Sequence, residues 1–381
     1  MVNAHNNLSL ASLISKDYGL CARCLSRQLS LPRRGRTTGM KTKKYGKSNA
    51  GQCHICRGLM DSTADLLALI LDSLQGYQFR TFLIGAMLPQ QILEREDEVR
   101  ARFKVRGREN IKSDLTRELG KLLGSTTGTV VDYLRPDVNI NLDLKKREVA
   151  VRSRPIYLFG RYVKNVRGLK QKQERCGLCR GKGCGECGNT GLAGFDSVEG
   201  IILKKLVESF GCSGAKFAWV GGEDKESLVL NEGRPFFVKV VNPKARFADP
   251  GRISFEDGVR ARFLKEVGSF PDRPLRFRVR VKLVVECDQN VDSASLERLR
   301  ELNNASVKFI GKRKREVSKN IHELDAAKAS ENLLEVLMLV DSGLTIKQFV
   351  GGDGVEPNIS QLLGCKATCK YFDVLDVQLL D

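Results

Sequence analysis

The stretch Trp219–Val241, WVGGEDKESLVLNEGRPFFVKVV, decides how the C-terminal half of this 381-residue chain folds. Strand-forming residues flank a Gly221-Gly222 pair, which predicts a tight turn between two strands with Asp224 exposed on it. Asn231-Glu232-Gly233 predicts a hairpin, after which residues 236–241 return as a further strand. A carboxylate that is held rigidly on such a turn, while remaining accessible, is suited to act as a nucleophile.

The sequence around this stretch predicts a catalytic domain over residues 195–381. Asp196-Ser197-Val198-Glu199 resembles a capping box and opens a helix that runs through Phe210. The segments 275–286 and 336–340 predict further strands. We therefore expect a multidomain α+β fold, with a mixed, mainly antiparallel sheet in this domain.

Eight of the twelve cysteines form four CxxC pairs. No basic and hydrophobic leader opens the sequence, so we expect a cytoplasmic protein with reduced thiols, in which CxxC pairs bind metal rather than form disulfides. Four thiolates are the tetrahedral ligand set of structural zinc sites, and His54 is a less favoured alternative ligand. The predicted Zn²⁺ ligands are Cys21, Cys24, Cys53, Cys56, Cys176, Cys179, Cys184 and Cys187. Whether the two clusters bind separate zinc ions stays open.

Three segments precede the catalytic domain. Residues 1–75 are interpreted as an N-terminal zinc-binding module whose basic loop, Arg33 to Lys47, suits phosphates. Residues 76–165 carry strand and helix patterns and are interpreted as a compact α+β domain. Residues 166–194, which contain CGLCRGKGCGECGNTG, are interpreted as a second cysteine knuckle in which glycines allow tight turns around a metal.

The net charge indicates an anionic partner. The chain has 64 Lys and Arg residues against 45 Asp and Glu residues, a formal net charge of +19, and such an excess attracts nucleic acid above all. A further basic cluster consists of Lys308, Lys312, Arg313, Lys314 and Arg315. The apolar runs are far shorter than a membrane span, so we expect no membrane association. We expect the protein to be a monomer.

Five segments together resemble the archaeal and eukaryotic tRNA pseudouridine synthases of the Pus-ten type, over nearly the whole chain. They are the N-terminal CxxC pairs with CHICRGL, RPDVNINLD…RPIYLFGRYVKNVRGLKQ (135–171), the knuckle at 176–191, GGED…LNEGRPFFVKVVNPKAR (221–246) and GLTIKQFVGGDG…LLGCKATCKYFDVLDVQL (343–379). The resemblance implies that residues 76–165 form a THUMP-like RNA-binding domain and that residues 195–381 form a pseudouridine synthase domain.

The resemblance also implies an activity and its residues. The expected enzyme is an isomerase that converts uridine to pseudouridine in the T-loop of tRNA, at tRNA positions 54 and 55, without a metal, nucleotide or other cofactor in the chemistry. Asp224 falls at the position of the nucleophile, and Lys347 at that of a base that keeps it ionised and oriented. Val281, Thr345 and Arg234 are assigned to substrate binding. Asp353 falls at the position of an acid that follows this lysine in the family, and it is expected to have a structural role.

Three positions depart from the family's pattern. Gly222 stands where the family has an arginine that helps to flip the target nucleotide, and Val281 and Thr345 stand where it has tyrosines that contact uracil. A lost aromatic stack costs about 1–3 kcal/mol per base, so this chain is expected to be slow or narrow in specificity. The alternative is a non-catalytic tRNA-binding or chaperone protein on a decayed synthase scaffold. Other THUMP-bearing tRNA enzymes would need a glycine-rich nucleotide-binding loop, and metal hydrolases a histidine cluster, and the sequence has neither.

Overall fold

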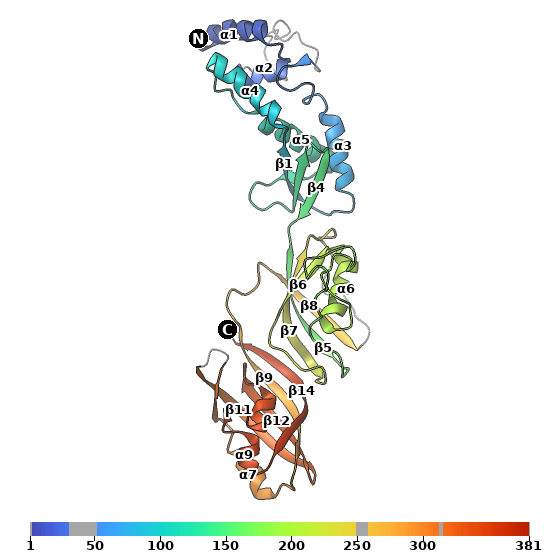
Figure 1. The fold of residues 1–381 in the computed structure, drawn as a ribbon, viewed down its shortest axis with the longest axis vertical. Helices are drawn as coiled ribbons and strands as arrows, with labels where there is room; N and C mark the ends of the chain where they lie inside the picture. The colour runs from blue at the N-terminus through green and yellow to red at the C-terminus, as the bar shows by residue number, and fades with distance from the viewer. Residues whose placement is uncertain (1, 30–51, 249–257, 312–314, 381) are drawn as a thin grey trace. The chain divides into compact units, whose positions relative to one another are not determined.

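The computed structural model describes residues 2–29, 52–248, 258–311 and 315–380. The chain forms two compact units, Met1–Arg154 and Pro155–Asp381, and each has its own hydrophobic core (Figure 1). Within the described residues, every helix is either too short or too polar to span a bilayer.

The N-terminal unit is built on a four-stranded sheet in the order β2–β1–β3–β4. β1 pairs in parallel with β2 and β3, and β3 forms an antiparallel hairpin with β4. Helices α3 and α5 contact each other and this sheet, and their buried faces carry Leu66, Ile70, Leu115 and Leu119. Its elements are α1 (Val2–Asp17), α2 (Ala22–Leu29), α3 (Thr63–Ser73), β1 (Thr81–Met87), α4 (Gln90–Phe103), α5 (Ile111–Thr127), β2 (Val130–Val131), β3 (Val138–Asp143) and β4 (Glu148–Ser153).

The C-terminal unit is built on a ten-stranded sheet. Nine strands follow the order β13–β10–β11–β12–β9–β14–β7–β5–β8, and β6 pairs with β7. Only the β14–β7 pairing is parallel among the strand pairs described, so the prediction of a mixed, mainly antiparallel sheet and an α+β class is confirmed. Its elements are β5 (Ile156–Lys164), α6 (Val198–Phe210), β6 (Gly214–Trp219), β7 (Val229–Val241), β8 (Val259–Val267), β9 (Arg276–Cys287), α7 (Ser293–Arg300), β10 (Ser306–Ile310), β11 (Glu316–Ser330), β12 (Leu333–Asp341), α8 (Ile346–Gly351), β13 (Val355–Glu356), α9 (Ile359–Leu363) and β14 (Ala367–Leu380).

Strand β5 belongs to the C-terminal unit, although the expected domain limits place it in the preceding domain. The sequence assigns its residues to the domain that ends at 165, but β5 lies between β7 and β8 in the second sheet. The reason is its alternation, because Ile156, Leu158 and Tyr162 are buried and fill the core of the C-terminal unit. The strand is therefore part of the C-terminal unit.

The predicted hairpin at Asn231-Glu232-Gly233 is wrong. β7 runs without interruption through these residues and pairs with β5 on both sides of them. The positive φ angles of Asn231 (52°) and Gly233 (78°) accommodate an irregularity instead, where the β5 register shifts between Tyr162 and Lys164. Gly233 is required there, since a Cβ would lie 2.4 Å from the Tyr162 carbonyl oxygen.

Helix α6 covers one face of the β5 region. It begins after Ser197, whose hydroxyl accepts a hydrogen bond from Gly200 N, and it ends at Gly211 as predicted. Its buried residues share a core with the inward side chains of β5 and β7 (Figure 1). Because strand side chains alternate, the intervening residues Tyr157, Phe159 and Arg161 point to the opposite face of the sheet.

Candidate active site

Asp224 lies on the turn that connects β6 to β7. Gly221 begins this turn with φ of 75°, and a Cβ at that position would lie 2.6 Å from Arg234 Nη1, so glycine is needed there. The Asp224 side chain is 44% exposed, and its Oδ2 lies 2.5 Å from Lys347 Nζ. The structure thus brings together the two residues that the sequence predicts as a catalytic pair.

Lys347 reaches Asp224 from the start of a short helix. The family motif that falls on Thr345-Ile346-Lys347 implies a strand at these residues, and this expectation is wrong. β12 ends at Asp341, the chain turns at Gly343 (φ 97°), and Lys347 is the second residue of α8. The hydrogen bond to Asp224 raises the pKa of Lys347 above its usual value, so the ammonium group is charged at neutral pH. The pair is therefore an accessible ion pair of a carboxylate and an ammonium.

A buried network fixes the backbone just before Asp224. The Glu223 side chain is fully buried; its Oε2 lies 2.9 Å from Arg234 Nε, and both carboxylate oxygens accept from Tyr162 Oη, at 2.7 and 2.8 Å. Gln171 Nε2 in turn donates to Tyr162 Oη at 2.8 Å. Burial, and then the charge of Glu223, raise the pKa of Tyr162 well above its usual range, so the hydroxyl remains a donor. Buried charges arranged in this way hold one geometry because each has its partner.

A buried lysine binds the catalytic turn from within the sheet. Lys164, the last residue of β5, is 0% exposed, and its Nζ donates to the carbonyl oxygens of Leu169 (2.8 Å), Asp224 (3.1 Å) and Lys225 (3.2 Å). Burial lowers its pKa, whereas the charge of Glu223 raises it. An ammonium group has three donors, and here all three bond to backbone carbonyls. Lys164 therefore holds the main chain of the turn that carries Asp224.

Arg167 closes the far end of the same turn. Its guanidinium makes a bidentate pair with Asp373 of β14, with both distances 2.8 Å, and also donates to the Glu226 carbonyl. The guanidinium carbon lies 4.1 Å from the centre of the Tyr371 ring. Asp373 also accepts a hydrogen bond from Leu228 N at 2.9 Å. The turn is thus tied to β5, β7 and β14.

The residues predicted to bind substrate occupy different environments. Arg234 is 2% exposed and donates to the carbonyl oxygens of Val220 (2.9 Å) and Gly222 (3.3 Å), so it supports the turn. Val281 is 1% exposed in β9, within the core. Thr345 is exposed at the start of α8, two residues before Lys347, and Asp353 is exposed just after that helix. Only Thr345 of the three predicted substrate contacts is accessible beside the ion pair.

Sequence reasoning missed the residues that support the turn. Lys164, Arg167 and Gln171 fall in GRYVKNVRGLKQ, a segment that the sequence places at the exit of the RNA-binding domain. One signal was available: Lys164 stands at an inward position of the alternating strand Ile156–Lys164, where an apolar residue is expected. A lysine on the buried face of a strand indicates a specific set of acceptors.

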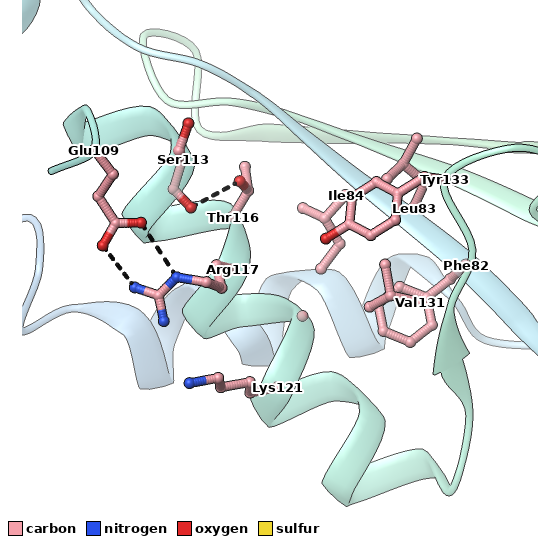
Figure 2. Close-up of a pocket in the computed structure, with 11 residues that line it drawn as sticks. Phe82, Leu83, Ile84, Glu109, Ser113, Thr116, Arg117, Lys121, Val131 and Tyr133 are labelled. Atoms are coloured by element: carbon pink, nitrogen blue, oxygen red, sulfur yellow. Dashed lines mark hydrogen bonds and ion pairs between the residues drawn. The ribbon is translucent and has the colours of Figure 1, made fainter. Parts of the chain in front are cut away.

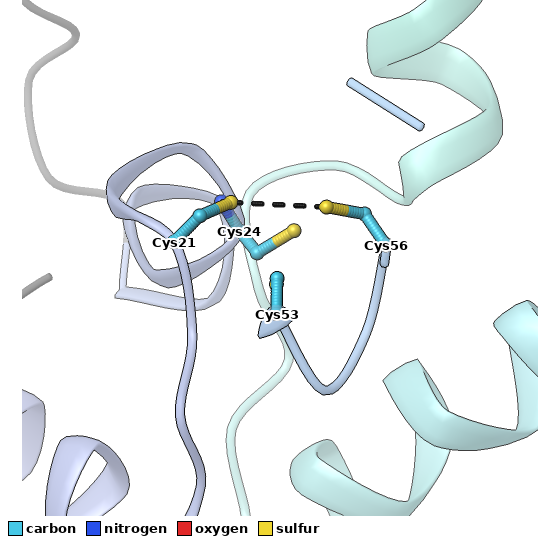
Figure 3. A group of neighbouring side chains, drawn as sticks. All are labelled: Cys21, Cys24, Cys53 and Cys56. Carbon is cyan, nitrogen blue, oxygen red and sulfur yellow. Dashed lines mark hydrogen bonds between the residues drawn. The ribbon is translucent and has the colours of Figure 1, made fainter. Parts of the chain in front are cut away.

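Two cysteine tetrads have the geometry of tetrahedral metal sites. In each, the four sulfur atoms lie within 4.8 Å of one another. The pair distances of 3.8 Å for Cys21–Cys56 (Figure 3), 3.9 Å for Cys176–Cys184 and 3.7 Å for Cys184–Cys187 match the roughly 3.8 Å expected for sulfurs about 2.3 Å from one central ion. The alternative ligand His54 instead has its Nε2 atom 3.2 Å from Glu98 Oε2. The residues therefore fit a metal ion held by four thiolates in each tetrad.

The predicted basic segments are described only in part. The loop Arg33–Lys47 and the residues Lys312, Arg313 and Lys314 lie outside the described residues. Lys308 on β10 pairs with Glu316 at 3.1 Å, with both side chains 63% exposed, and Arg315 is exposed. The described part of the second cluster is thus a solvated surface.

The N-terminal unit has a pocket of about 430 Å³ between α5 and the β1–β2 edge (Figure 2). Arg117, which is bound to Glu109 at 3.0 Å, and Lys121 line it on the helix side, and Tyr133, 77% exposed, lines it on the other. Its other lining residues are Phe82, Leu83, Ile84, Glu109, Ser113, Thr116, Gly120 and Val131. The pocket combines cations with an aromatic ring.

Comparison with known proteins matches both units. Residues 67–143 match the family model "Pus10 THUMP domain, archaeal", and residues 157–261 and 278–378 match "Pus10, C-terminal". The tRNA pseudouridine synthase Pus10 of Nitrosopumilus maritimus is 37% identical, with 98% of each chain covered. That of Cenarchaeum symbiosum is 36% identical, with 95% of this chain and 90% of the relative covered. A crystal structure of a Cbf5-Nop10-Gar1 complex overlaps 57% of this chain and 57% of its own at 10% identity, with a TM-score of 0.30 that supports no argument.

Proposed function

The chain belongs to the Pus10 family of tRNA pseudouridine synthases, which are isomerases, and on that premise we propose that Asp224 is the nucleophile with which it converts T-loop uridines of tRNA to pseudouridine. The observation that carries the proposal is the 2.5 Å ion pair between Asp224 and Lys347, half-exposed on a turn whose backbone is held from beneath. A nucleophile must be both fixed and reachable, and this carboxylate is both. The proposed targets are tRNA positions 54 and 55.

The proposed chemistry is an isomerisation that needs no oxidant or co-reactant. Asp224 attacks C1′ of the uridine as the N1–C1′ glycosidic bond breaks. After the base has turned, C5 bonds to C1′ and the bond between C1′ and Asp224 breaks, which restores the carboxylate. The proton on C5 leaves and N1 gains one, so the atoms balance. Lys347 orients the Asp224 carboxylate for this attack, because its ammonium group lies 2.5 Å from Asp224 Oδ2.

We assign RNA binding to the N-terminal unit, which matches the THUMP model, together with the overall charge of +19. The pocket beside α5 supports this assignment, since Lys121 can bind a phosphate and Tyr133 can stack on an unpaired base (Figure 2). The two cysteine tetrads would each hold a structural Zn²⁺, which would fix the segments around them and supply no step of the reaction.

Mapping of pseudouridine on an unmodified tRNA transcript tests the proposed function. The wild-type protein, with no added cofactor, is expected to convert uridine at position 54, at position 55 or at both. A protein that binds the transcript but leaves every uridine unchanged would favour the non-catalytic alternative. The Asp224–Lys347 ion pair supports the catalytic function over the non-catalytic alternative.

Lys347→Met is expected to lower kcat by about 10- to 100-fold, because it removes the charge that orients Asp224. Lys347→Arg should retain more activity, since the cation remains. The pKa of Lys347 is raised by its hydrogen bond to Asp224, so the ammonium group persists below that pKa and no loss of activity through Lys347 is expected between pH 7 and pH 9. Single-turnover rates of the three proteins check this, and equal rates for Met and Arg would contradict it.

Lys164→Met is expected to lower kcat by about 100-fold with little effect on KM, because a displacement of the nucleophile by about 1 Å costs that much. Lys164 is a positioning residue, since it acts only through the backbone of Asp224 and Lys225. The matched control is Lys170→Met, whose side chain is 61% exposed. Steady-state kinetics and a thermal melt of the same variant distinguish a loss of positioning from a loss of folding. If Lys164→Met is folded and its kcat is unchanged, Lys164 does not position Asp224.

A further inference from the structure

The strand that carries Lys164 also presents aromatic residues on its other face. The outward residues of β5 are Tyr157, Phe159, Arg161 and Val163, at alternate positions and half-buried. The inward residues pack with α6 or bind the catalytic turn. The two faces of one strand therefore differ in chemistry, and no step of the proposed reaction uses the outward one.

Neighbouring strands extend this aromatic surface. Phe159 lies opposite Phe237 of β7, with ring centres 4.9 Å apart, and Tyr157 packs edge-on against Phe270 at 5.4 Å. Lys239 Nζ lies 5.4 Å from the centre of the Tyr157 ring, and Lys265 Nζ lies 5.9 Å from that of Phe159. Aromatic cross-strand pairs alone stabilise a sheet, but lysines set beside the rings add a charge that a purely structural cluster does not need.

The stripe continues into a small cationic pocket. A cavity of about 150 Å³ is lined by Arg161, Val163, Asn231, Glu232, Arg260, Ala261 and Arg262. Arg161 is fixed by donating to the carbonyl oxygens of Gly233 (2.8 Å) and Val377 (2.9 Å), and Arg262 pairs with Glu232 at 2.7 Å. Arg260 is exposed. A pocket with three arginines and one carboxylate is suited to a phosphate group.

We propose that this stripe, defined as Tyr157, Phe159, Phe237, Lys239, Lys265 and the pocket of Arg161, Arg260 and Arg262, binds unpaired nucleotides of the RNA substrate. Sheet surfaces bind single-stranded RNA by stacking bases on aromatic side chains beside cations, and this surface has both. The proposal rests on the proposed function for the identity of the RNA. It adds a second contact, on the sheet face that carries the outward residues of β5.

Binding of a fluorescently labelled, unstructured oligouridine to the full-length protein tests the stripe. Because one stack contributes about 1–3 kcal/mol, the double variant Y157L/F159L, which keeps the apolar volume, should weaken binding at least about 10-fold. Arg260→Glu, at an exposed position that folding does not need, should weaken it too. Phe195→Leu, an exposed aromatic outside the stripe, is the control and should bind like the wild type.

Crosslinking and activity separate this proposal from the proposed function. A tRNA transcript containing 4-thiouridine should crosslink to the peptide that contains Tyr157 and Phe159, and Asp224→Asn should leave that crosslink in place. If the wild type makes pseudouridine but Y157L/F159L and Arg260→Glu bind oligouridine and tRNA like the wild type, the stripe is overturned and the function stands. If the variants lose RNA affinity but the wild type makes no pseudouridine, the stripe stands and the function fails.

Discussion

Asp224→Asn is expected to abolish pseudouridine formation, with a fall in rate on the order of 10⁴-fold or more. The substitution keeps the size and shape of the side chain but removes the charge and the nucleophilic oxygen. The amide can still lie beside Lys347, so the turn is expected to keep its conformation, because its support comes from Lys164, Arg167 and Arg234. Single-turnover conversion of an unmodified tRNA transcript is the measurement.

The matched control is Glu226→Gln, which also neutralises an acid of the same turn. Glu226 is 49% exposed, and its carboxylate lies 3.8 Å from the ammonium group of its neighbour Lys225, so its loss should change the rate by less than about threefold. Both variants should bind tRNA with wild-type affinity and the same salt dependence, since neither touches the cationic surfaces. If Asp224→Asn converts uridine at the wild-type rate, Asp224 is not the nucleophile.

Much of the fold follows from periodicity in the sequence. Helix α6 shows capping at both ends, β9 alternates apolar with basic residues and β12 is mostly apolar, so all three were predictable. Helix α4 was not predictable, because half of its sequence QQILEREDEVRARF is charged and the helix buries only Glu96 and Val99. Glu96 is buried because it pairs with Arg27 of α2 at 3.1 Å, a partner 69 residues away that no local pattern reveals.

In the candidate site, too, local sequence predicts one part, and the other part depends on residues far apart in the chain. The exposed position of Asp224 on a turn was predictable because two glycines and a change of strand stand beside it in the sequence, whereas its role as nucleophile was implied by the family resemblance. Its supports come from β5, β7 and β14, and Arg167 and Asp373, which pair at 2.8 Å, are 206 residues apart. The resemblance assigned Arg234 to substrate binding, whereas in the structure Arg234 is buried and donates a hydrogen bond to the turn. Pairing of distant polar residues is decided by topology, which a single sequence does not display.

The departures from the family's pattern also gain a physical reading. Gly222 is exposed and has no positive φ, and a Cβ there would meet only the side-chain oxygen of Gln171, at 3.2 Å. The backbone therefore does not require glycine at this position. Val281, by contrast, is enclosed in the core, so a larger ring there would have to displace neighbours. A side chain could therefore be accommodated at position 222 without a change of the backbone, whereas a larger one at position 281 would require the core to rearrange.

Cys53→Ser is expected to remove one of two bound zinc ions and to unfold the segment around α2 and residues 52–60. Cys24, Cys53 and Cys56 are buried in the core of the N-terminal unit, so the metal would hold α2 against the turn that follows residue 52. A structural zinc contributes about 10–16 kcal/mol in small peptides, which is as large as the stability of many domains. Elemental analysis and hydrogen exchange of the full chain measure both effects.

Cys365→Ser is the matched control, because Cys365 belongs to neither tetrad and should leave two zinc equivalents and the exchange pattern unchanged. Cys187→Ser should remove the other equivalent and affect only the knuckle. The two tetrads lie in different compact units and each closes its own set of four sulfurs, so the losses should be independent. A single equivalent in the wild type, lost in both Cys53→Ser and Cys187→Ser, would mean a shared site instead, and a metal-free protein with wild-type stability would leave the tetrads without a structural ion.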